Sequence, residues 1–160
     1  MILYHGSKDR SIQKFEIFNK RNNLDFGAGV YLTTKQKQAE RWAGPNGAVY
    51  VFDIDTSKLT CVEYTDEDLN FVFYLCRIEL EEIAKETIEG FDSADIISGQ
   101  MLDGTVRKFE IIAEKFNEGD ITYDEFEKHI KIFGDKDQLC FKTQKAIDLL
   151  NQSLVARIDL

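Results

Sequence analysis

The chain has few cysteines, and this scarcity excludes several classes of protein. Its three cysteines, Cys61, Cys76 and Cys140, lie far apart in the sequence. Their number and spacing match neither a disulfide framework nor a zinc motif. We therefore expect a reducing, cytoplasmic setting and no metal centre. Cys76 and Cys140 stand in apolar stretches that are typical of ordinary buried thiols.

Long apolar runs and an excess of basic residues are also missing. No apolar segment approaches the roughly 20 residues that a membrane-spanning helix needs, so we expect no membrane partner. Met1 leads directly into a predicted strand without the features of a signal peptide. The 29 acidic residues outnumber the 20 basic ones and give a net charge of −9. Because non-specific nucleic-acid binding depends on clusters of Lys and Arg, a nucleic-acid acceptor is not favoured.

The remaining composition is that of one globular domain. A chain of 160 residues, with 12 Phe and 6 Tyr, is long and aromatic enough to bury a core. We expect a single domain over 1–160 of the α+β class. Its middle carries a helical insert, in which 66–90 and 105–131 are mainly helical by their spacing of apolar residues.

Local signals predict where the elements begin and end. Thr34 is a plausible N-cap for a helix over 35–43, which the glycines and proline of 44–47 end. Thr122 followed by Glu125 forms a capping box, and Thr143 caps a last helix to about 152. Further helices are expected over 66–86, 105–117 and 122–130. Strands are expected over 1–5, 30–34, 48–54, 95–99 and 138–141.

Two short segments carry the most informative pattern. Tyr4–Ser7 closes an apolar run, and His5 is expected at a strand end beside Gly6, where a ligand can approach the bare backbone. In Asp25–Thr34, two glycines precede a strand in which Tyr31 alternates with apolar neighbours and points into a cleft. Taken alone, such a His is most often a solvated strand end, and such a Tyr a packing residue. Their co-occurrence with the glycines favours a binding site for a planar ligand.

These segments resemble the ADP-ribosyltransferase superfamily in its diphtheria-toxin-like, histidine–tyrosine branch. More closely, the chain is similar to a family of bacterial proteins of unknown function that share an ordered set of motifs. Tyr-His-Gly-Ser is followed by Asp-Phe-Gly-x-Gly-x-Tyr-Leu-Thr and then by Gln-Ala-x-x-Trp-Ala. Here these motifs are 4–7, 25–33 and 38–43, and weaker similarity continues at 95–99 and 138–146.

The resemblance implies a fold of two small packed β-sheets, flanked by helices, that holds NAD as a co-substrate. His5 is then expected to bond the adenosine ribose, the Gly6 backbone to hold the nicotinamide carboxamide, and Tyr31 to stack on nicotinamide. The third catalytic position, usually Glu, falls on Gln138. The cofactor-binding set that the resemblance implies is His5, Gly6, Ser7, Asp25, Phe26, Gly27, Gly29 and Tyr31.

Gln138 separates two functions. Cleavage of the nicotinamide–ribose bond develops positive charge on the sugar, which a carboxylate stabilises and a neutral amide does not. The resemblance implies an NAD-dependent mono-ADP-ribosyltransferase with a protein acceptor, toxin-like and accompanied by a neutralising partner, and the neutral Gln138 argues against chain-forming poly-ADP-ribosylation. The alternative is a weak or inactive NAD-binding module that acts as a sensor or interaction partner. Trp42 is expected to be a core aromatic, while Arg41 and Asp103 are weaker candidates for ligand contacts.

Overall fold

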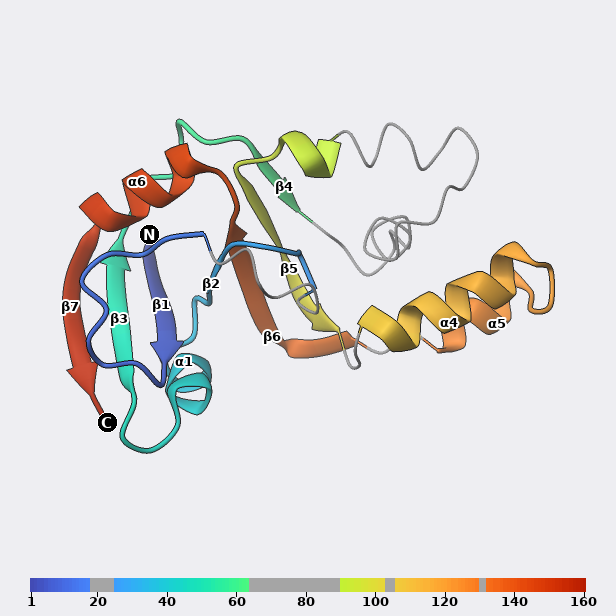
Figure 1. Ribbon diagram of the computed structural model, residues 1–160, viewed down its shortest axis with the longest axis horizontal. Coiled ribbons are helices and arrows are strands. Elements are labelled where there is room, and N and C mark those ends of the chain that lie inside the picture. The colour runs from blue at the N-terminus through green and yellow to red at the C-terminus, as the bar shows by residue number, and fades with distance from the viewer. Residues whose placement is uncertain (18–24, 64–89, 103–105, 130–131) are drawn as a thin grey trace.

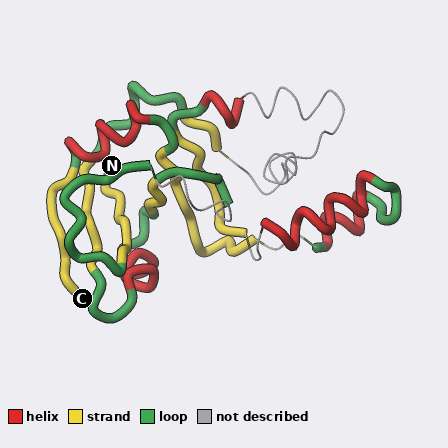
Figure 2. Tube along the Cα trace, in the orientation of Figure 1, coloured by secondary structure: helices red, strands yellow, loops and turns green. Residues whose placement is uncertain are grey.

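The computed structural model describes residues 1–17, 25–63, 90–102, 106–129 and 132–160. The chain is mixed α/β with two small sheets (Figure 1). Of the range 66–90, expected to be helical, only Gly90 is described, and the Cys76 and Asp103 expectations also lie outside the described residues. The tube view shows a region of strands and short helices at one end and a helical hairpin at the other (Figure 2).

The first sheet has the strand order β1-β3-β7, with both pairs antiparallel. Its strands are β1 (Ile2–Ser7), β3 (Ala48–Asp53) and β7 (Leu154–Asp159). The strand β7 was not expected from the sequence, because every one of its residues is exposed and it therefore shows no alternation of buried and exposed positions.

The second sheet has the strand order β2-β6-β5-β4. Its strands are β2 (Val30–Leu32), β4 (Cys61–Glu63), β5 (Ile96–Leu102) and β6 (Ile132–Phe141). Only β4 and β5 run parallel; the other pairs are antiparallel. Strands β5 and β6 are longer than predicted, because polar residues such as Asp137 and Gln100 continue them beyond their apolar ends.

The helices confirm most of the predicted caps. They are α1 (Gln36–Ala43), α4 (Val106–Asn117), α5 (Tyr123–Lys128) and α6 (Gln144–Gln152), and residues 90–93 are also helical. The Thr143 hydroxyl accepts from the Ala146 N–H at 3.2 Å, as a cap does. Thr122 and Glu125 exchange the two bonds of a capping box, at 2.8 and 3.3 Å. One cap was wrong: the N-cap of α1 is Lys35.

The two sheets pack on each other through a shared apolar core. Leu3, Tyr50 and Phe52 of the first sheet meet Leu32 and Phe141 of the second, and all five are at most 1% exposed. Helix α6 adds its buried face of Ala146, Ile147 and Leu150 to this cluster. Helix α1 covers the opposite face of the first sheet, where Ala39 and Ala43 contact Val49. The core therefore fixes β1 beside β2.

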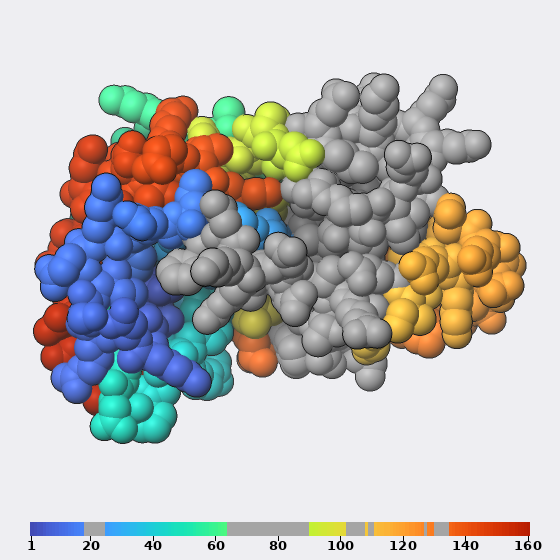
Figure 3. Space-filling view, in the orientation of Figure 1, coloured from blue at the N-terminus to red at the C-terminus, as the bar shows by residue number. Residues whose placement is uncertain are grey.

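Helices α4 and α5 form the hairpin that projects from the sheets. The space-filling view places this hairpin, in orange, at the end opposite the N-terminal segment, in blue (Figure 3). Phe116 of α4 packs against Phe126 of α5, with ring centroids 5.5 Å apart. None of the described helices is both long and apolar enough to cross a membrane.

Candidate functional site

Strands β1 and β2 meet at one pair of residues and then separate. Tyr4 and Thr33 exchange both backbone hydrogen bonds, each 2.9 Å long. In the same register Gly6 would pair with Tyr31, but within these two described strands that backbone bond is not formed. Because hydrogen-bonding direction alternates along a strand, the N–H and C=O of Gly6 point toward β2, as those of Tyr4 do. The Gly6 N–H and C=O therefore remain as a hydrogen-bond donor and acceptor beside Tyr31 of β2.

Gly6 lies within a strand, and this corrects the expectation that it ends one. It pairs with Val49 of β3, and β1 continues to Ser7. A Cβ on Gly6 would lie 1.9 Å from the Ala39 carbonyl oxygen, so α1 already occupies that face. The absent side chain therefore admits the helix, and only the in-plane N–H and C=O remain for a ligand.

His5 connects the two strands through its side chain. Its Nδ1–H donates to the Tyr31 carbonyl oxygen at 2.7 Å, in the place where Gly6 would have bonded. The ring also packs edge-on against Phe15, with centroids 5.2 Å apart. Burial lowers the pKa of His5 below its usual 6.5, although the bond to Tyr31 opposes the change. The imidazole is therefore neutral at pH 7, with Nε2 as a hydrogen-bond acceptor.

Tyr31 holds the loop that precedes it. Its hydroxyl accepts from the Phe26 N–H at 2.9 Å and donates to the Gly27 carbonyl at 2.8 Å. The rings of Phe26 and Tyr31 are nearly parallel, 9° apart, with centroids separated by 6.2 Å. Burial raises the pKa of Tyr31 far above its usual value, so the phenol stays protonated. As predicted, the neighbours Val30 and Leu32 face the core.

Gln138 reaches the same loop from β6. Its side chain is 3% exposed, and its Nε2 donates to Asp25 Oδ2 at 2.6 Å and to the Gln100 carbonyl at 3.4 Å. Strand pairing sets Tyr31 beside Cys140, two residues along β6, on the same face as Gln138. Burial raises the pKa of the Cys140 thiol to about 12, so it remains a neutral packing group.

Gly27, Gly29 and Ser7 of the predicted set make contacts that shape the site. Gly27 has φ +77°, a conformation that side chains rarely adopt. A Cβ on Gly29 would lie 2.4 Å from Cys140 Sγ, so this glycine lets the loop run against β6. Ser7 Oγ accepts from the Asp9 N–H at 3.0 Å and stabilises the turn after β1. These contacts hold the loop and strands in place.

Sequence reasoning missed a second set of polar contacts beside Gln138. The Asp137 carboxylate accepts from the hydroxyls of Thr33 and Thr34, which explains why Thr34 does not cap α1. Gln38 of α1 is 2% exposed and donates from Nε2 to the Asp137 carbonyl at 2.6 Å. Its Oε1 is buried without a hydrogen-bond partner among the described residues. The signal was present, since Gln38 opens the third motif.

Other candidates do not join this group. Trp42 is half-buried, because α1 turns Gln38, Ala39 and Ala43 fully inward. It does not belong to the core clusters that the described residues form, so the expected core position is only partly met. Arg41 is exposed and borders a surface hollow that Lys37 and Leu160 also line. Within the described residues, no three His, Cys, Asp or Glu side chains gather to hold a metal ion.

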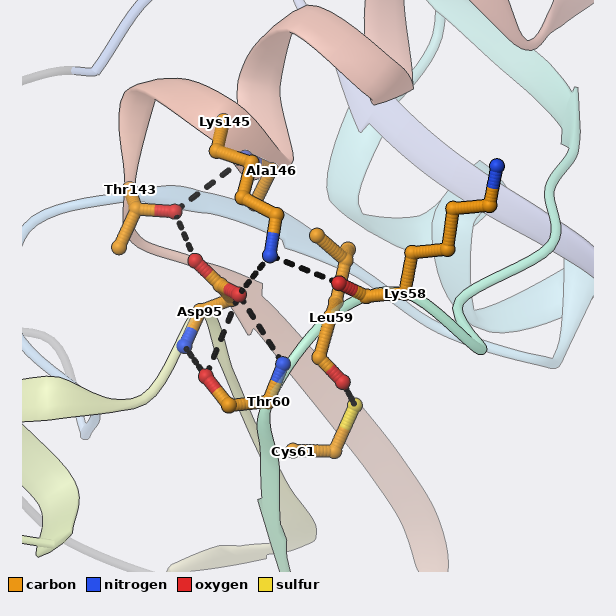
Figure 4. Close-up of polar contacts among 8 residues, drawn as sticks. All are labelled: Lys58, Leu59, Thr60, Cys61, Asp95, Thr143, Lys145 and Ala146. Atoms are coloured by element: carbon orange, nitrogen blue, oxygen red, sulfur yellow. Dashed lines mark hydrogen bonds and ion pairs between the residues drawn. The ribbon is translucent and has the colours of Figure 1, made fainter.

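Asp95 forms a separate buried polar cluster that joins β5 to α6 (Figure 4). Asp95 is 6% exposed, and its carboxylate accepts from Thr143 Oγ1 at 2.5 Å, the Thr60 N–H at 3.0 Å and Lys145 Nζ at 3.1 Å. Burial alone would raise the pKa of Asp95, but these hydrogen bonds lower it to about 2. The role of Asp95 is therefore structural.

Comparison with protein families places the chain in one of them. The family described as "Protein of unknown function (DUF3990)" matches residues 1–152, and the chain belongs to this family. Comparisons with curated proteins and with solved structures found no match.

Proposed function

We propose that the chain is an NAD-dependent mono-ADP-ribosyltransferase built on an ADP-ribosyltransferase-like fold. In the proposed reaction the bond between nicotinamide and ribose breaks, and its electron pair leaves with nicotinamide. A nucleophile on an acceptor protein forms the new bond to the sugar and loses its proton to water. A cytoplasmic effector that a neutralising partner protein holds in check is the setting that the resemblance supports.

The separation of β1 and β2 at Gly6 is the observation that carries this proposal. An adjacent backbone N–H and C=O can pair with both ends of a carboxamide, which is the polar group of nicotinamide. Two antiparallel strands normally continue their ladder, so the interruption directly beside Tyr31 leaves strong hydrogen-bonding groups without the partner that the register offers. A ligand that bonds Gly6 would also lie beside Tyr31.

The neutral charge and the tautomer of the His5 imidazole support a positioning role at the ribose. A neutral imidazole whose Nδ1–H is already donated presents only Nε2, which accepts a hydrogen bond from a hydroxyl. The fixed tautomer suits orientation of a sugar and gives His5 no proton to deliver from Nε2. His5 and Gly6 are neighbours on β1, so both contacts would be made by one strand.

The neutral amide of Gln138 favours the second function, a weak or inactive NAD-binding module. Its nitrogen is already engaged by Asp25 and by the Gln100 carbonyl. A group that neither carries charge nor accepts a proton gives limited stabilisation to a cationic transition state. The transferase and the NAD-binding module would both bind NAD, and only the transferase would turn it over efficiently.

The proposed function predicts a difference between two variants of Tyr31. Tyr31→Ala removes the ring that would stack on nicotinamide, and we expect NAD affinity to fall by roughly 1 kcal/mol or more, measured by calorimetry. Tyr31→Phe keeps the ring and removes only the hydroxyl that binds Phe26 and Gly27. It is expected to keep most of the affinity. Equal affinity of wild type and folded Tyr31→Ala would remove Tyr31 from the nicotinamide site.

Release of nicotinamide then separates the enzyme from the module. Purified protein is incubated with NAD, with and without a mixture of acceptor proteins, and free nicotinamide is measured. Release by wild type that Tyr31→Ala loses supports the transferase. NAD binding without release supports the module, and absence of both contradicts the two functions together.

A further inference from the structure

We propose that Asp25 supplies, through Gln138, the negative charge that Gln138 itself lacks. Asp25 is then a positioning residue, which fixes the Gln138 amide and sets a carboxylate two hydrogen bonds away from the reacting sugar, with Gln138 between them. This inference rests on the proposed function, because it names the group that makes the same site competent for turnover.

The first support is the hydrogen bond between the two side chains. Gln138 Nε2 donates to Asp25 Oδ2 at 2.6 Å, and Gln138 is 3% exposed. A hydrogen bond to a charged acceptor is about twice as strong as one between neutral groups, and burial strengthens it further. It therefore fixes which end of the amide faces Asp25. In the proposed site the oxygen Oε1 accepts from a ribose hydroxyl.

The second support is that Tyr31 holds the loop carrying Asp25. The Tyr31 hydroxyl binds the N–H of Phe26, the residue directly after Asp25, and the carbonyl of Gly27. The segment 25–27 is thus held by hydrogen bonds from two side chains on neighbouring strands, Tyr31 on β2 and Gln138 on β6. The carboxylate is held by contacts from the residues that are proposed to touch nicotinamide and ribose.

The chemistry explains what this carboxylate contributes. Positive charge develops on the ribose as the electron pair of the breaking bond leaves with nicotinamide. A fixed negative charge behind the Gln138 amide stabilises that state more than the ground state. Asp25 takes no proton in this scheme, since the proton of the acceptor passes to water.

The contact also changes what Gln138→Glu should do. The sequence alone predicts that this substitution raises turnover about a hundredfold, by placing charge at the sugar. In the structure it would set two carboxylates at hydrogen-bonding distance, and like charges that close cannot both ionise freely. We therefore expect no such gain from Gln138→Glu alone.

Variants that move the negative charge from position 25 to position 138 test the proposed role of Asp25. Nicotinamide release and NAD affinity are measured for wild type, Asp25→Asn, Gln138→Glu and the double variant Asp25→Asn/Gln138→Glu. We expect kcat of Asp25→Asn to fall about tenfold or more while KM changes less than about threefold. The double variant should recover most of that loss, because it again holds one charge. Asp120→Asn, which removes an exposed carboxylate from the tip of the α4–α5 hairpin, should behave as wild type.

Two results would overturn the role of Asp25 while the proposed function stands. One is an active wild type whose kcat is unchanged by Asp25→Asn. The other is a double variant as slow as Asp25→Asn alone, which would show that Asp25 holds the loop and provides no charge. If neither wild type nor any variant releases nicotinamide, the proposed function fails and this role with it.

Thermal melting without NAD tests the contact between residues 25 and 138 independently of catalysis. Paired carboxylates hold a proton more tightly when folded than when unfolded, so Gln138→Glu should lose stability as pH rises from about 5 to 8. The double variant should lose much less over the same range. Identical pH profiles of the two variants would show that positions 25 and 138 do not touch, whatever the outcome with NAD.

Discussion

Asp95→Ala is expected to lower the free energy of unfolding by about 3–5 kcal/mol. The substitution leaves the Thr60 N–H and the Thr143 hydroxyl without their acceptor in a site that is 6% exposed. These bonds join the β4–β5 pair to the start of α6, which contributes to the main core. The ion pair itself adds little, since Lys145 is 60% exposed. Denaturant unfolding followed by circular dichroism measures the loss.

Asp148→Ala is the matched control, because it removes an exposed carboxylate from the same helix. We expect it to change stability by no more than about 0.5 kcal/mol. An Asp95→Ala protein as stable as this control would show that the cluster in Figure 4 does not hold α6 to the second sheet.

His5→Ala is expected to reduce nicotinamide release by about a hundredfold or more. The variant loses both the Nε2 acceptor proposed for the ribose and the bond that ties β1 to the Tyr31 carbonyl. His5→Gln should keep activity within about tenfold of wild type, because its amide also carries one donor and one acceptor. Equal loss in the two variants would instead identify His5 as a proton-transfer group.

The same histidine makes stability depend on pH. Its folded pKa lies below the unfolded value of 6.5, so the unfolded state binds the proton more tightly. The stability that neutral His5 contributes is present above pH 6.5 and is lost as pH falls toward the lowered pKa. As pH falls from 7.5 to 5.5, the melting temperature of wild type should therefore decrease more than that of His5→Gln.

Features that depend on short-range chemistry were predictable from the sequence. The Thr143 cap, the capping box of Thr122 and Glu125, and the stop at Gly44 each involve residues within four positions of one another. The inward-facing pair Val30 and Leu32 followed from alternation along β2.

Features that depend on distant partners were not predictable. Thr34 bonds Asp137, more than a hundred residues away in sequence, so Lys35 and not Thr34 is the N-cap of α1. Gly6 admits α1, a role that only the packing of Ala39 reveals. The bond between Asp25 and Gln138 likewise joins two motifs that lie 113 residues apart in the sequence. The resemblance named both residues without indicating that they touch.

NAD is proposed to bind where β1 and β2 separate, and the backbone amide signal of Gly6 reports on that position. A two-dimensional ¹⁵N spectrum is recorded while NAD is added, and a second titration uses nicotinamide alone. We expect the Gly6 and Tyr31 signals to shift in a saturable manner with NAD, and the Gly6 signal to shift with nicotinamide as well. Unchanged Gly6 and Tyr31 signals at millimolar NAD, with the protein folded, would contradict this proposal.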